Sequence, residues 1–128
     1  MNLSEQDFDL YRLKYALSIY LVRQVILADD IVEPQEINFV REHFPQSLLQ
    51  ALDLLKPEEI SLLIERALDE LPRKLSLEAK LDIVGICFAA AASNGNVDPR
   101  EIAIIQVAAE VLSVPSEVLL DFIHQLLQ

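Results

Sequence analysis

The chain has 128 residues, the length of one domain, and its 52% hydrophobic content with only two glycines argues against disorder. Asp and Glu total 21 against 10 Lys and Arg, so the net charge of -11 repels nucleic-acid phosphates and anionic lipid. The single cysteine, Cys87, excludes an intrachain disulfide and a cysteine-rich zinc site. The N-terminus lacks a secretory signal, and the longest apolar run is about half a membrane span. We therefore expect one cytoplasmic domain, residues 1–128, without nucleic-acid binding or membrane insertion.

Apolar residues recur at intervals of three and four through most of the chain, which is the spacing of a helix face. Pro34, Pro57 and Pro99 each stand where a helix begins, because the first helical position has no partner for the N–H group that proline lacks. No alternation of apolar and polar residues is long enough to indicate a strand. The sequence predicts a compact all-α bundle of about seven helices. They are expected over residues 5–28, 34–43, 47–55, 57–71, 76–92, 99–112 and 116–127.

Two stretches have an expected place in the core. Phe8, Tyr11 and Tyr15 form a stripe along the first helix that is expected to be buried. The alanines of residues 89–92 leave little side-chain bulk, so another helix can approach closely. The fifth helix is therefore the expected centre of the bundle, and Cys87 on it is expected to be a packed thiol.

A faint internal repeat relates the two halves of the chain. Residues 27–37 align with residues 92–102 at a constant offset of 65, and valine, proline, glutamate and isoleucine coincide. In each copy an apolar helix ends in a polar turn, and a new helix begins at proline. Two copies are too few for a solenoid. They predict a closed bundle with an internal pseudo-twofold helix-turn-helix repeat, in which the first and fifth helices pack as equivalents.

Helix capping explains nearly every residue of the two turns. Asp98 is a good N-cap, and Glu101 can accept a hydrogen bond from the amide of the cap. Glu33 and Glu36 repeat this pattern with a poorer cap. Gly95 suits the end of the preceding helix, because glycine adopts the left-handed conformation that a chain reversal needs.

The same turns can instead be read as cation sites, since each gathers the oxygen ligands that Ca²⁺ and Mg²⁺ prefer. Neither turn is an EF-hand, because Pro99 stands where that loop needs glycine and Ile105 where it needs a bidentate glutamate. The candidate ligands are Asp29, Asp30, Glu33 and Glu36 in the first turn, and Asn94, Asn96, Asp98 and Glu101 in the second. Capping and cation binding both remain open on spacing alone.

The turns also carry a family resemblance. The pattern is a small residue, Asp, Gly, any residue and an aliphatic residue after an apolar helix, with a glutamate four residues later. It reads Ala-Asp-Asp-Ile-Val at residues 28–32 with Glu36, and Ser-Asn-Gly-Asn-Val at residues 93–97 with Glu101. This pattern resembles that of the TerB-like helical domain of tellurite-resistance proteins, over most of the chain. The resemblance implies an all-helical fold and a metal-associated or protein-interaction role in stress and tellurite resistance.

Carried over by position, the resemblance nominates Asp29 and Glu36 in the first turn and Glu101 in the second as cation ligands. Asp30 stands where the family has glycine. Asn94 stands where the family has aspartate, which removes a negative charge from the second turn. The first turn is therefore the better candidate for a divalent-cation site.

The leading hypothesis is a non-enzymatic, cytoplasmic, stress- and tellurite-resistance-related domain that interacts with proteins and binds Ca²⁺ or Mg²⁺ at its acidic turns. One alternative is a helical oligomerisation or scaffold domain without metal. Another is a hydrolase or transferase with paired carboxylates in a pocket that joins the two turns. No phosphate loop, nucleophile elbow or metalloprotease motif supports an enzyme.

Three further side-chain groups bear on partners and ligands. His43 and His124 each lack a second ligand at helical spacing, so both are expected at the surface. The last helix carries a broad apolar stripe that either completes the core or forms a homodimer. The stripe consists of Leu119, Leu120, Ile123, Leu126 and Leu127.

Overall fold

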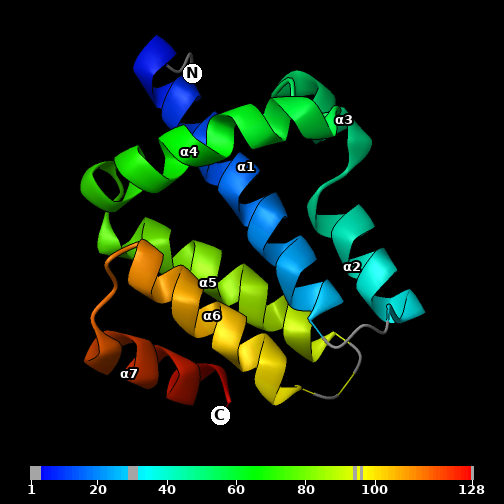
Figure 1. Ribbon diagram of the computed structural model, residues 1–128, viewed down its shortest axis with the longest axis vertical. Coiled ribbons are helices and arrows are strands. Elements are labelled where there is room, and N and C mark those ends of the chain that lie inside the picture. Colours follow the sequence, from blue (N-terminus) through cyan, green and yellow to red (C-terminus); the bar gives the residue numbers. More distant parts are fainter. Residues whose placement is uncertain (1–3, 29–31, 94, 96, 128) are drawn as a thin grey trace.

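The structure of the protein, a computed structural model, describes residues 4–28, 32–93, 95 and 97–127. These residues form seven α-helices and no strand (Figure 1). The all-α prediction is therefore confirmed. The helices are α1 (Glu5–Leu27), α2 (Pro34–His43), α3 (Gln46–Ala51), α4 (Pro57–Lys74), α5 (Leu77–Ala92), α6 (Pro99–Val111) and α7 (Ser116–Leu126). Among them, none is both long and apolar enough to cross a membrane.

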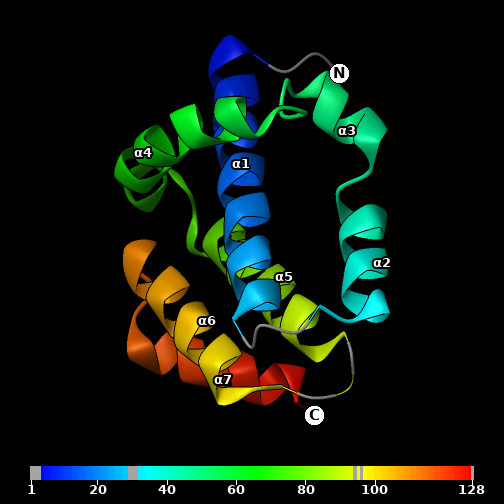
Figure 2. The same ribbon diagram turned by 45° about the vertical axis from the view of Figure 1, so that its right-hand side comes forward.

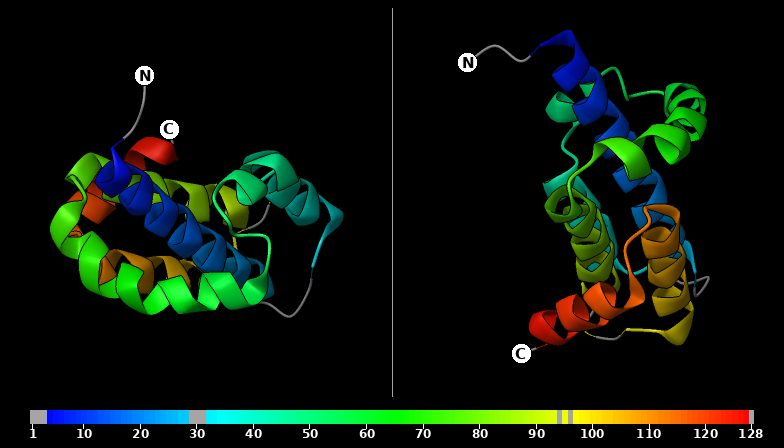
Figure 3. Two further views of the ribbon diagram at one scale, coloured as in Figure 1. Left: turned by 90° about the horizontal axis from the view of Figure 1, so that it is seen from above. Right: turned by 90° about the vertical axis from the view of Figure 1, so that its left-hand side faces the viewer.

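The first helix forms the centre of the bundle. It packs against α4, α5 and α6 (Figures 1 and 2), and viewed from above it crosses the interior between its neighbours (Figure 3). Nine of its residues are buried, against six in α5. Apolar side chains on more than one face suit a helix to this place. The buried residues of α1 are Leu13, Ala16, Leu17, Ser18, Ile19, Leu21, Val22, Val25 and Ile26.

The fifth helix, which the alanine run had suggested as the centre, packs against α1, α2 and α6. Only the inner pair of that run, Ala90 and Ala91, is buried. A second close approach occurs at Gly85, where a Cβ atom would lie 3.2 Å from Cζ of Phe122 in α7. Small residues in α5 therefore admit close neighbours at two positions.

Two helix boundaries differ from those expected. The fourth helix continues through Pro72 to Lys74 instead of ending near Leu71. A proline is tolerated there because only the last turn follows it, and the amide of Leu75 still donates to the carbonyl of Leu71 at 3.0 Å. The third helix ends at Ala51, four residues early, because Asp53 adopts a positive φ of 55°.

The sixth helix also ends before a non-glycine residue with a positive φ, a conformation that is sterically unfavourable for a residue with a Cβ atom. Ser113 has φ of 62°, and the amide of Val114 donates to the carbonyl of Ala109 at 2.9 Å, as in a Schellman motif. Ser113→Gly is expected to stabilise the protein by about 0.5–1 kcal/mol, because glycine adopts this conformation without a Cβ clash. Urea unfolding measures the change. Ser116→Gly, in the first turn of α7, is the control and should not stabilise; equal effects would contradict the explanation.

Cys87 is fully buried in α5, as expected for a packed thiol. Burial raises its pKa to about 12, because a thiolate would lose its hydration there. We expect the native protein to resist an aromatic disulfide reagent at pH 8 and to react only as fast as it opens, while denatured protein reacts at once. The thiol form is favoured until the pH approaches 12. Rapid reaction of native protein at pH 8 would contradict this burial.

The expected aromatic stripe of α1 is only partly in the core. Phe8 and Tyr11 are exposed, so the prediction was wrong for these two residues. Tyr15 is half-buried, and its ring meets the edge of Phe44 with centroids 6.2 Å apart. The N-terminal end of α1 projects past α4 at this end of the bundle (Figure 1). The hydroxyls of Tyr11 and Tyr15 lie 3.3 Å apart, and their hydrogen bond, together with burial, favours the neutral form of Tyr15 and raises its pKa to about 12.

Candidate functional site

The helix after the first turn is capped at its N-terminus by a buried glutamate. Pro34 opens α2, and Glu36, two residues later, has no exposed surface. The backbone amide of Glu33 donates to Oε1 of Glu36 at 2.9 Å, so the carboxylate satisfies an amide that the helix itself leaves without a partner. A fully buried carboxylate is costly unless such bonds hold it. Glu36 therefore acts first as a cap.

The second turn has the same form. Glu101 is also fully buried, and its Oε1 accepts from the amide of Asp98 at 2.8 Å. Gly95 has the positive φ, 86°, that the sequence predicted for the end of α5. The capping pattern predicted for both turns is thus confirmed, although complete burial of the two glutamates was not foreseen.

Asp98 differs from its counterpart in its partners. Its Oδ1 accepts from the amide of Arg100 at 2.8 Å, and the guanidinium of Arg100 contacts both carboxylate oxygens at 3.0 and 3.1 Å. These hydrogen bonds hold the pKa of Asp98 below its usual value. Since an arginine already neutralises this carboxylate, a cation would have to compete with it.

The two turns lie at the same end of the molecule, where α1 and α5 end and α2 and α6 begin (Figures 1 and 2). Four predicted ligands can be placed, namely Glu33, Glu36, Asp98 and Glu101. The others, Asp29, Asp30, Asn94 and Asn96, lie outside the described residues. Among the described residues, no three acidic, histidine or cysteine side chains form a group that could hold a metal ion. Cation binding therefore stays a prediction that depends on the remaining ligands.

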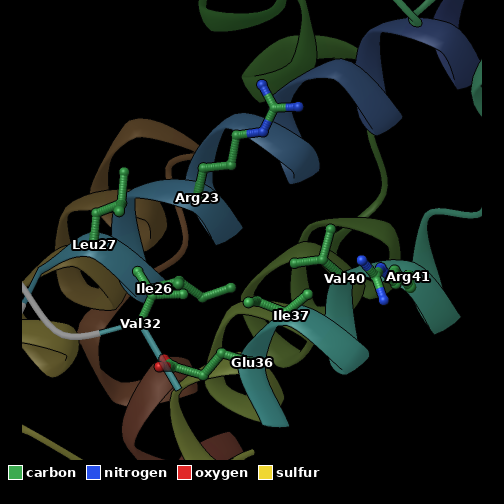
Figure 4. Close-up of a pocket in the computed structure, with 8 residues that line it drawn as sticks. All are labelled: Arg23, Ile26, Leu27, Val32, Glu36, Ile37, Val40 and Arg41. Carbon is green, nitrogen blue, oxygen red and sulfur yellow. The ribbon is translucent and has the colours of Figure 1, made fainter. Parts of the chain in front are cut away.

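An apolar groove lies beside the first turn, between the last turns of α1 and the middle of α2 (Figure 4). It measures about 300 Å³ and its lining is almost wholly apolar. Glu36 marks one end, and two arginines lie away from it (Figure 4). The groove, as we use the term below, is lined by Arg23, Ile26, Leu27, Val32, Glu36, Ile37, Val40 and Arg41. It includes residues of the first turn and none of the second.

Sequence reasoning missed this groove, although it left a signal. Leu27, Val32 and Ile37 are apolar residues that flank the first turn, and all three remain exposed in the folded chain. The sequence shows that these residues are apolar, but it does not show that they stay exposed in the part of the chain that the structure describes.

The two histidines lie outside both turns. His43 ends α2, where it is exposed, its ring stacks on Phe39 at 4.0 Å and its Nδ1 lies 3.0 Å from the carbonyl of the same residue. His124 is exposed on α7. The surface position expected for both is confirmed.

These observations define an all-α bundle with two polar turns at one end, each followed by a helix that a buried glutamate caps. A family model described as tellurite resistance protein TerB matches residues 16–121. The chain belongs to this family. Comparison with curated proteins and comparison with solved structures each gave no match.

Proposed function

We propose that this TerB domain is a non-enzymatic, cytoplasmic stress-response module that binds other proteins and holds a divalent cation, Ca²⁺ or Mg²⁺, at its first acidic turn. The observation that carries the proposal is Glu36, a fully buried carboxylate that ends a run containing Asp29, Asp30 and Glu33. Carboxylate oxygens are the ligands that hard cations prefer. The net charge of -11 also favours cations at the surface.

The donor set of the first turn fits such an ion better than that of the second. Glu36 already accepts the capping bond through Oε1, and its carboxylate would also serve as a ligand of the ion. In the second turn Arg100 engages both oxygens of Asp98, and position 94 carries an amide instead of a carboxylate. Three negative charges therefore accompany Glu36, and one that is already paired accompanies Glu101.

Glu36→Gln is the decisive variant, because glutamine keeps the acceptor for the amide of Glu33 and removes only the charge. Thermal unfolding and titration calorimetry would be measured with Ca²⁺, Mg²⁺ and Mn²⁺. At a hundredfold excess over the dissociation constant, the bound ion is expected to stabilise the protein by about 2.7 kcal/mol. Glu36→Gln should weaken this response, and Glu36→Gln combined with Asp29→Asn should lose it.

Glu101→Gln is the matched control, since it makes the same change at the second turn. It should keep the cation response of the unmodified protein. If none of the three ions stabilises the protein at millimolar concentration, or if the paired first-turn variant responds fully, cation binding at this turn is wrong.

The alternative is a scaffold domain in which both turns only cap helices, and the capping bonds of Glu36 and Glu101 favour it directly. It predicts that Glu36→Gln and Glu101→Gln have equal and small effects on stability at every cation concentration. The same titrations therefore separate the two functions.

A further inference from the structure

The groove combines an apolar floor with two arginines, Arg23 and Arg41, at its edges. Leu27 and Ile37 are 55% and 43% exposed on opposite walls. Among the residues that the structure describes, Arg23 and Arg41 form no ion pair, and of the five basic residues in this position they are the two that line the groove. Two such guanidinium groups in a strongly acidic protein mark a place for a segment that is apolar and carries carboxylates.

The last helix of the same chain has this chemistry. Leu120 is 57% exposed, and Leu127, the C-cap residue of the helix, is 67% exposed. The two residues are about two helical turns apart. Glu117 and Asp121 are exposed beside them, and α7 contains no lysine or arginine. Leu119 is buried, so the stripe predicted on this helix is divided between the core and the surface. Its exposed part is an acidic, leucine-bearing helix face.

We propose that the groove binds α7 of a second copy of this chain. Leu120 and Leu127, seven residues apart, are the spacing of anchors that an amphipathic helix lays into an apolar groove. Glu117 and Asp121 would then meet Arg23 and Arg41. The groove lies beside α2 and α7 lies beyond α5 and α6 (Figures 1 and 3), so the contact joins two molecules.

A contact of this kind is heterologous, because it joins two different surfaces. It leaves each copy with one free groove and one free α7 until a ring closes. The exposed areas are small, so we expect a weak association, with a dissociation constant on the order of 100 µM. The inference rests on the proposed role in protein interaction and is independent of cation binding.

Two variants each remove one half of the contact. Ile37→Glu puts a carboxylate in the groove, four residues before Arg41, where the two side chains pair. Leu120→Lys replaces the anchor of α7 with a charge that the arginines repel. Both positions are exposed, so the fold should survive, and circular dichroism checks this. Sedimentation equilibrium or light scattering at ~0.15 M salt, where charges are screened beyond about 8 Å, measures the mass.

The unmodified chain should gain mass between roughly 10 µM and 1 mM, and each variant alone should associate about tenfold more weakly. An equal mixture should form a 1:1 dimer and nothing larger, since one variant supplies an intact α7 and the other an intact groove. Leu62→Glu, on a leucine of α4 that is 77% exposed, is the control and should associate like the unmodified chain.

The proposal is overturned if the unmodified chain stays monomeric at every concentration, if both variants associate as it does, or if their mixture stays monomeric. All measurements are made with a chelator present. Failure here therefore leaves the cation titrations unaffected, and failure of those titrations leaves this result unaffected.

Discussion

Replacing Glu101 with alanine is expected to lower the free energy of unfolding by about 2–3 kcal/mol, because the variant loses a helix cap and leaves the amide of Asp98 without its acceptor. The side chain is fully buried and its Oε1 accepts from that amide at 2.8 Å. Glu101→Gln retains an acceptor, so its loss should be about 1 kcal/mol or less. Urea denaturation followed by circular dichroism measures both losses.

The control is Glu110→Ala, on the exposed surface of the same helix. It should change the free energy of unfolding by less than about 0.5 kcal/mol. If Glu101→Ala costs no more than this control, or if Glu101→Gln costs as much as Glu101→Ala, the buried carboxylate is not a cap.

Leu17→Ala in α1 is expected to cost about 3 kcal/mol, from the lost burial of the side chain and the cavity it leaves. Leu17 is fully buried in the helix that packs against α4, α5 and α6. A cavity there cannot close without moving several helices, so little of the loss should be recovered. The midpoint of urea unfolding should fall while the denaturant slope stays the same.

Leu62→Ala, on a leucine that is 77% exposed, tests whether this effect comes from burial and not from the change of residue type. It should cost less than about 0.5 kcal/mol. A similar cost at both positions would contradict the central place of α1.

Local signals in the sequence were sufficient for the helices and for the caps. Pro34, Pro57 and Pro99 each open a helix, and the capping pair of Asp98 and Glu101 forms as expected. Such features depend on residues three or four apart, so their physics can be read from the chain itself.

Features that depend on distant residues were not accessible in this way. Phe8 and Tyr11 lie outside the core, because the spacing of apolar residues does not show how far neighbouring helices extend along α1. The burial of Glu36 and the uncovered groove beside it also result from how α1 and α2 meet. The half-chain symmetry stays a prediction, although the two capping boxes have the same form.

The central position of α1 has a consequence for how the chain is made. Its apolar residues lie in Glu5–Leu27, yet their partner α6 ends only at Val111, about 80 residues later. At a synthesis rate of roughly 5–20 residues per second, the ribosome needs on the order of 4–16 seconds to complete that partner. During this interval the face of the first helix that α6 covers stays exposed, although α4 and α5 are made earlier, and a chaperone that binds nascent chains has a substrate there.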